Sequence, residues 1–217
     1  MSPINDDTIL QAREYVRGRL YGEGTGHDWW HIHRVTEMAE RIASHEQADT
    51  FVCTLAALFH DLADEKVVES SGAGLREIQE WLNTHGVSAN DRDHILDIID
   101  TMSYRGGHGE PMKTPEGMVV QDADRLDAIG AIGIARTFAY AGSKGHILYD
   151  PDIPPRTAMT VEQYRKDTNT AVNHFYEKLL KLRDLMNTDY GKQLAAQRHA
   201  YMENFLAQFY CEWQAEK

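Results

Sequence analysis

Two short runs of this chain contain the residue types that hold metal ions in proteins. The first is His60-Asp61, at the end of an apolar run, and the second begins at Asp122 and includes Asp124. His31 comes before both. Burying an ionised carboxylate at the end of an apolar helix is costly unless a partner compensates its charge, and a metal ion is such a partner. The order of these residues therefore predicts a metal site that supports hydrolytic chemistry.

Four ligands are expected, namely His31, His60, Asp61 and Asp124. Imidazole and carboxylate together suit Mn, Fe, Co, Ni or Zn, and a carboxylate-rich site also suits Mg. Four protein ligands leave positions open for water and substrate, as a catalytic site requires. Each residue alone has an ordinary structural explanation, so it is their joint order that favours a metal. Asp122 stays an alternative ligand, although two residues before Asp124 on a helix it should face away.

Three charged residues, Asp64, Glu65 and Lys66, follow the His-Asp pair. On a continuing helix, Asp61, Asp64 and Glu65 would share one face. A carboxylate one turn from a metal ligand can hold and deprotonate a water molecule, so these residues are catalytic candidates. The alternative is a solvated helix end with a Glu/Lys pair.

The bulk properties limit the partners of the protein. The chain has 217 residues, 42% of them hydrophobic, and a formal net charge of -12. Such a charge disfavours nucleic-acid polymers and anionic membranes, but a metal and a few local cations can still bind a small phosphorylated substrate. Cys53 and Cys211 cannot make a disulfide framework, and the chain begins without a basic and apolar leader. We expect a cytoplasmic protein, monomeric or homodimeric.

Helical periodicity extends along almost the whole chain, and no strand alternation of useful length is present. It predicts an all-α fold in which three helices bring the ligands together in the core of a bundle. We expect a single domain over residues 1–217, with a metal-binding core at about 26–140 and C-terminal helices at about 160–213 that pack on it. The expected helices cover residues 7–20, 28–43, 49–62, 75–83, 88–102, one starting at 114, 160–186 and 190–213, with loops at 70–74, 103–113 and 142–155.

Three segments together resemble the HD-domain superfamily of metal-dependent phosphohydrolases. Residues 26–35 are similar to the segment that gives the first histidine ligand, 59–64 to the His-Asp signature, and 120–130 to the last-ligand segment. Asp64 falls where related members have an acidic residue next to the nucleophilic water. Residues 144–146 and 174–180 further resemble a bacterial subgroup of the YedJ/YpgQ type, some of whose members are manganese-dependent nucleotide pyrophosphohydrolases.

The resemblance implies an HD-domain helical bundle with one divalent metal ion, manganese, in its core. It implies hydrolysis of a small phosphorylated metabolite, a nucleotide, in the manner of a nucleoside triphosphate pyrophosphohydrolase. The alternatives are a non-catalytic nucleotide-binding regulatory module, or a phosphomonoesterase or phosphodiesterase. Basic side chains must hold the phosphates, and the candidates are Lys66, Arg34, Lys144, His174 and Lys178.

Overall fold

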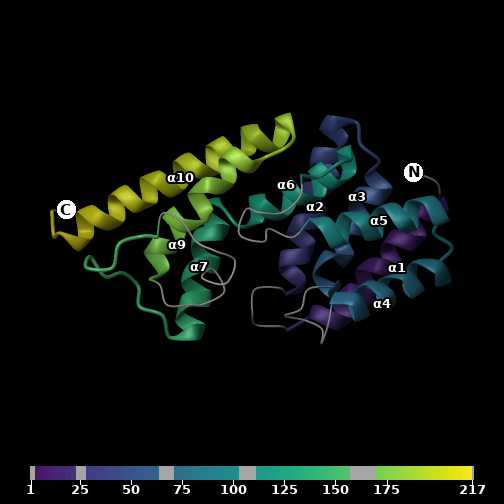
Figure 1. Cartoon of the computed structure of the whole chain (residues 1–217), viewed down its shortest axis with the longest axis horizontal. Coiled ribbons are helices and arrows are strands. Elements are labelled where there is room, and N and C mark those ends of the chain that lie inside the picture. Colours follow the sequence, from purple (N-terminus) through teal and green to yellow (C-terminus); the bar gives the residue numbers. More distant parts are fainter. Residues whose placement is uncertain (1–2, 23–27, 64–70, 103–110, 157–169, 217) are drawn as a thin grey trace. The chain divides into compact units, whose positions relative to one another are not determined.

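A computed structural model of the protein describes residues 3–22, 28–63, 71–102, 111–156 and 170–216 (Figure 1). These residues form helices, turns and loops and contain no strand, which confirms the all-α prediction. None of the described helices is long and apolar enough to cross a membrane. The elements are α1 (Pro3–Leu20), α2 (Trp29–Glu46), α3 (Thr50–Phe59), the 3-10 helix η1 (His60–Ala63), α4 (Ser71–Thr84), α5 (Ala89–Thr101), α6 (Pro115–Asp127), α7 (Gly130–Lys144), α9 (Ala171–Glu177), the 3-10 helix η3 (Leu179–Leu185) and α10 (Asp189–Trp213).

The chain divides into two compact units, Met1–Asp124 and Arg125–Lys217, and the boundary falls within α6. The single domain over residues 1–217, and the packing of its C-terminal helices on the metal-binding core, stay predictions.

Helix α3 is the centre of the first unit and contacts α1, α2 and α5. Every residue from Phe51 to Phe59 is buried, as an uninterrupted apolar run requires. The helix begins at an N-cap, because the Asp49 carboxylate accepts hydrogen bonds from the backbone N–H groups of Phe51 and Val52. Cys53 lies on this helix as a buried free thiol, and Cys211 is free as well, in agreement with the absence of a predicted disulfide.

The prediction that the third helix continues to Leu62 was wrong, because the α-helix ends at Phe59 and η1 follows. The His60 ring makes a 2.8 Å hydrogen bond from Nδ1 to the carbonyl oxygen of Ala57. In a continuing α-helix the N–H of Asp61 would use that carbonyl. The side chain thus satisfies a carbonyl of the last α-turn, and the backbone tightens to 3-10 geometry.

The start of α4 also differs from the sequence prediction, which placed a loop at residues 70–74. The helix already includes Ser71, Gly72 and Gly74. Glycine is a poor helix former, so local preference predicts a loop here. Packing overrides that preference, since α4 contacts both η1 and α5 and buries Ile78 and Leu82.

The second unit contains α7, α9, η3 and α10 around an aromatic core. Phe138, Phe175 and Phe205 lie with their ring centroids 5.8 to 5.9 Å apart. The prediction of one continuous helix to Met186 was wrong, because Lys178 leaves helical geometry at φ -134° and ψ -61°. Lysine is a good helix former, so the reason is tertiary: α9 packs on α7 as well as on η3, whereas η3 packs on α10.

The predicted loop at 142–155 begins later than expected, because residues 142–144 still belong to α7. Residues 145–156 are irregular, and hydrogen bonds to α9 fix their path. Gly145, with φ 71°, ends α7 in the left-handed region, where glycine has no steric penalty. The N–H groups of Ala171 and Val172 then donate to the carbonyls of Ile147 and Leu148. This segment therefore lies against the first turn of α9.

Candidate metal centre

His31 lies in the first turn of α2, which an N-cap holds in place. The Asp28 carboxylate accepts a 2.8 Å hydrogen bond from the backbone N–H of His31 itself. The apolar face of α2, which includes Ile32 and Val35, is buried. His31 belongs to the same buried part of the helix and is only 2% exposed, so its ring points into the first unit.

His60 and Asp61 lie where α3 passes into η1, and both are buried. The hydrogen bond between His60 Nδ1 and the Ala57 carbonyl requires the ring proton to be on Nδ1, because a carbonyl only accepts. In the neutral ring the lone pair is then on Nε2, the atom that faces the neighbouring carboxylates. A backbone carbonyl that orients a histidine in this way is a common feature of metal ligands.

Asp124 lies in the last turns of α6. This helix begins with Thr114, whose Oγ1 accepts from the N–H of Gly117, and with Pro115 in its first turn. The side chain of Asp124 is 40% exposed, so it lies at the border between the buried cluster and solvent. Asp122 is fully buried and is not among the residues that approach one another there.

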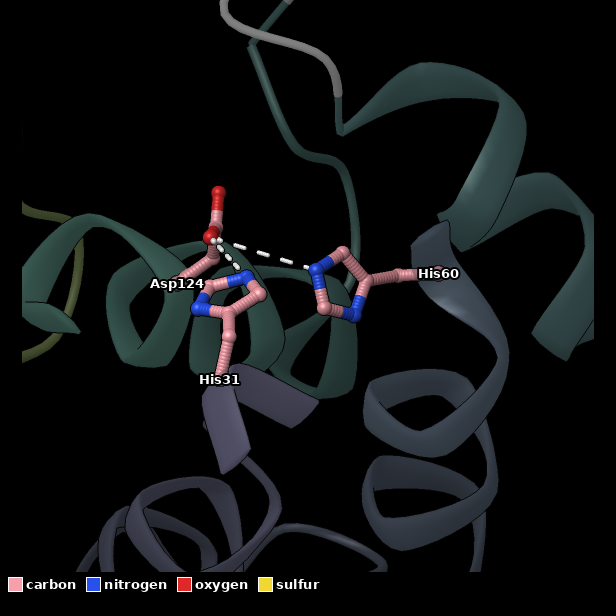
Figure 2. A group of neighbouring side chains, drawn as sticks. All are labelled: His31, His60 and Asp124. Atoms are coloured by element: carbon pink, nitrogen blue, oxygen red, sulfur yellow. Dashed lines mark ion pairs between the residues drawn. The ribbon is translucent and has the colours of Figure 1, made fainter. Parts of the chain in front are cut away.

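Side chains from α2, the end of α3, and α6 meet at one point (Figure 2). One possible ligand atom from each of His31, His60 and Asp124 lies within 4.8 Å of the other two. Asp124 Oδ1 lies 3.5 Å from His31 Nε2 and 3.9 Å from His60 Nε2. The two imidazole rings are inclined at 70°, with 5.4 Å between their centroids.

Asp61 joins this cluster through both carboxylate oxygens. Its Oδ1 lies 3.2 Å from His60 Nε2 and its Oδ2 lies 3.5 Å from His31 Nε2, and the residue is only 4% exposed. Ligands that share one ion at about 2.1 Å are separated from one another by about 3 to 3.5 Å. The nitrogen and oxygen atoms of the cluster therefore have the chemistry and the spacing to hold one divalent metal ion.

Some of the other predicted site residues lie outside the described part of the chain, and the rest can be located in the structure. Asp64, Glu65 and Lys66 lie outside the described residues. Arg34 is half-buried, one turn after His31 on α2. Lys144 is exposed at the end of α7, with Nζ 5.6 Å from the centre of the Tyr140 ring.

His174 and Lys178 lie at the end of α9, where the N–H of Lys178 donates to the His174 carbonyl. Burial lowers the pKa of His174 to about 4, and the charges of Lys178 and Arg156 act in the same direction against that of Glu177. At neutral pH His174 is therefore uncharged, so it would meet a phosphate as a hydrogen-bond donor and not as a cation.

Sequence reasoning missed an ion pair beside these residues. The guanidinium and the backbone N–H of Arg156 both donate to the buried carboxylate of Glu177, over 2.7 to 3.0 Å. The pair joins the end of the 145–156 segment to the last turn of α9. No local pattern signals it, because the partners come from separate segments and neither has a distinctive neighbour.

Comparisons with known proteins cover both units. Residues 29–129 match the family described as HD domain. The protein YpgQ of Bacillus subtilis (strain 168) is 42% identical over 201 residues, which are 91% of this chain and 90% of YpgQ.

Three solved structures are similar over nearly the whole chain. A Lactobacillus plantarum protein has a TM-score of 0.84 at 44% identity, over 97% of this chain and 98% of its own. An HD-superfamily hydrolase from Bacillus thuringiensis has 0.79 at 45% identity, over 97% and 99%. Bacillus subtilis YpgQ in complex with ADP has 0.78 at 40% identity, over 95% of each chain.

Proposed function

The chain belongs to the HD-domain family, and we propose that it is a metal-dependent phosphohydrolase that cleaves a nucleotide, in the manner of a nucleoside triphosphate pyrophosphohydrolase. The observation that supports this most directly is the convergence of His31, His60 and Asp124, with Asp61 in contact with both imidazoles. The ADP bound to YpgQ supports a nucleotide as the substrate class. The net charge of -12 argues against a nucleic-acid polymer.

Two imidazoles with two carboxylates suit a transition-metal ion. Among these metals we propose manganese, because some members of the YedJ/YpgQ subgroup that the chain resembles are manganese-dependent. His31, His60, Asp61 and Asp124 would hold it. When bound, a divalent ion lowers the pKa of water and neutralises charge on phosphoryl oxygens. The two free cysteines of the protein favour a reducing compartment, and we propose that the protein is cytoplasmic.

The protein side chains have separate tasks in the proposed reaction. The His60 hydrogen bond to Ala57 fixes the orientation of the ring and keeps Nε2 directed at the cluster. Asp64, by its place in the sequence, would take the proton from the water whose oxygen attacks the α-phosphorus, while the bond from that phosphorus to the bridging oxygen of the leaving pyrophosphate breaks. Arg34, Lys66, Lys144 and Lys178 are proposed to hold the phosphates as cations, with His174 as a neutral donor.

The test is an assay of chelator-treated protein supplied with Mn, Mg, Co or Ni and with nucleoside tri-, di- and monophosphates. We expect turnover of the triphosphate to a nucleoside monophosphate and pyrophosphate. His60→Ala and Asp124→Asn should lose at least 100-fold in kcat/KM, a loss of about 2.7 kcal/mol of transition-state stabilisation. His45→Ala, which changes an exposed histidine in the last turn of α2, is the matched control and should retain activity.

A second candidate is a regulatory module that binds nucleotide without cleaving it. The ADP in the YpgQ structure is equally expected of such a protein. Calorimetry separates the two functions: nucleotide binding without turnover, whichever metal is added, would replace the enzyme with the module. Turnover of the nucleoside monophosphate to nucleoside and inorganic phosphate would indicate a phosphomonoesterase.

A further inference from the structure

The first turn of α6 lies against the start of α3, and Glu116 makes the connection. Glu116 Oε1 accepts a 3.0 Å hydrogen bond from the backbone N–H of Asp49, the N-cap of α3. Its side chain is 15% exposed, so the carboxylate is largely withdrawn from water. One turn further along α3, Cys53 Sγ lies 3.9 Å from the carbonyl oxygen of Glu116. Burial raises the pKa of the Cys53 thiol, and the Glu116 and Asp49 carboxylates raise it further.

This hydrogen bond completes a helix cap that α3 cannot complete alone. In a capping box, the N-cap side chain accepts from the first turn, and a Glu or Gln at the third helical position accepts from the N-cap N–H in return. Asp49 performs the first part, but the third position is the apolar Val52. Glu116 supplies the missing acceptor from another helix.

The α6 side of the junction is also fixed. Thr114 Oγ1 accepts from the N–H of Gly117 and lies 2.9 Å from His94 Nε2, which lies 3.8 Å from Glu116 Oε2. A Cβ at Gly117 would lie 3.5 Å from Ile98 Cγ1, an ordinary contact distance, so the first turn of α6 is a neighbour of α5. The start of α6 is therefore held against α5 as well as α3.

The two helices that meet at this junction both lead to the candidate metal centre. His60 follows the last residue of α3, and Asp124 lies in the last turns of α6. We propose that Glu116 is a positioning residue for the metal centre: by capping α3 from α6, it sets the separation between His60 and Asp124. This inference rests on the proposed metal-dependent function, and it adds a residue that is not itself a ligand.

Two conservative variants separate the reach of Glu116 from its charge. Glu116→Gln keeps the length of the side chain and an oxygen acceptor for the Asp49 N–H. Glu116→Asp keeps the charge but is one methylene too short to keep the 3.0 Å hydrogen bond without a shift of α6. If Glu116 acts by positioning, Glu116→Asp should weaken metal binding, whereas Glu116→Gln should retain it.

The experiment measures Mn²⁺ affinity of the full chain by electron paramagnetic resonance titration, with thermal unfolding in parallel. We expect Glu116→Asp to weaken Mn²⁺ binding roughly tenfold, the lower end of what outer-sphere partners of metal ligands contribute, and Glu116→Gln to stay within about twofold of wild type. The control is Ser88→Ala, which removes the N-cap of α5, a helix without a ligand. It should lower the melting temperature but leave Mn²⁺ affinity unchanged.

Three results would overturn the inference. Wild-type affinity in Glu116→Asp would show that the junction does not set the ligand separation. An equal loss of affinity in Ser88→Ala would show that any weakened cap has the same effect. A wild-type protein that binds no divalent metal would remove the proposed function together with this inference, whereas the first two results leave that function intact.

Discussion

His31 Nε2 and Asp124 Oδ1 lie 3.5 Å apart, although one residue is in the first turn of α2 and the other is in the last turns of α6. The Oδ2 atom of Asp61 also lies 3.5 Å from His31 Nε2. Two carboxylates are thus directed at one largely buried imidazole. A divalent cation bound at this point would offset their negative charge and so stabilise the folded protein.

Mn²⁺ should stabilise the wild-type protein against heat. A ligand at 100 times its Kd stabilises the folded state by about 2.7 kcal/mol, which for a chain of this size raises the melting temperature by about 5 to 10 °C. Asp124→Ala should lose this increase, whereas His45→Ala should keep it. Differential scanning calorimetry with Mn²⁺ and with chelator measures both, and an equal increase in Asp124→Ala would refute the ligand assignment.

Asp64→Asn should keep the metal and lose turnover. A group that positions or deprotonates the attacking water contributes roughly 10²- to 10⁴-fold to the rate. Metal content and kcat are measured on the same preparation. Near wild-type kcat at full metal occupancy would show that Asp64 has no such role.

Lys144→Ala and Lys178→Ala should raise KM more for a nucleoside triphosphate than for a monophosphate ester. The reason is that added phosphates need added cations, and each lysine supplies one positive charge. Steady-state kinetics with both substrates tests this, with Lys192→Ala on the exposed face of α10 as the control. An equal increase in KM for the two substrates would show that neither lysine contacts the additional phosphates.

Acid should destabilise the second unit partly through His174. The unfolded chain protonates this histidine near its ordinary pKa of 6.5, whereas the folded protein does so only near 4, because the ring is desolvated. Between these values the unfolded state binds more protons, so stability is fully present above pH 6.5 and falls as the pH drops toward 4. Urea midpoints at pH 7 and pH 5 should therefore differ less in His174→Gln than in wild type. Parallel losses in the two proteins would contradict this.

Two glycines of α7 should respond to alanine in opposite directions. A Cβ on Gly133 would overlap the backbone carbonyl of Ala128, which cannot move cheaply, so we expect Gly133→Ala to cost about 1 to 3 kcal/mol. Gly142, on the same helix, has no neighbouring atom within 4 Å of such a Cβ. Gly142→Ala should stabilise by about 0.5 to 1 kcal/mol. Urea denaturation measures both changes in stability. A destabilised Gly142→Ala would show that helix propensity does not determine the effect of that substitution.

The sequence predicted the elements whose signals are local. The apolar run of α3 and its cap at Asp49, the Thr-Pro start of α6, and the long α10 all appear where the residue pattern placed them. The structure also brings predicted ligands together, since His31, His60 and Asp124 lie close to one another and Asp61 contacts both imidazoles. Helical register places Asp122 on a different side of α6 from Asp124, and the choice of Asp124 as the ligand stays a prediction.

The errors have a different origin. The break at Lys178, the early start of α4 and the 3-10 turn at His60 depend on partners from other segments or on a side chain that bonds to the backbone. The Arg156–Glu177 pair and the Glu116–Asp49 hydrogen bond are likewise contacts between distant segments. Propensity and periodicity contain no information about such contacts.

One of the segments that supply the ligands is far from the others along the chain, and this has a kinetic consequence. Helix α3 follows α2 directly, whereas α4 and α5 lie between η1 and α6. In the unfolded chain, Asp124 can therefore join His31 and His60 only if the long segment before it closes into a loop, and this closure costs entropy before any ligand pair with Asp124 forms. The site is therefore expected to be assembled late, after the folding transition state. Interactions absent from that state slow unfolding and leave the folding rate almost unchanged. Metal added to this protein should therefore lower its unfolding rate and should not accelerate its folding.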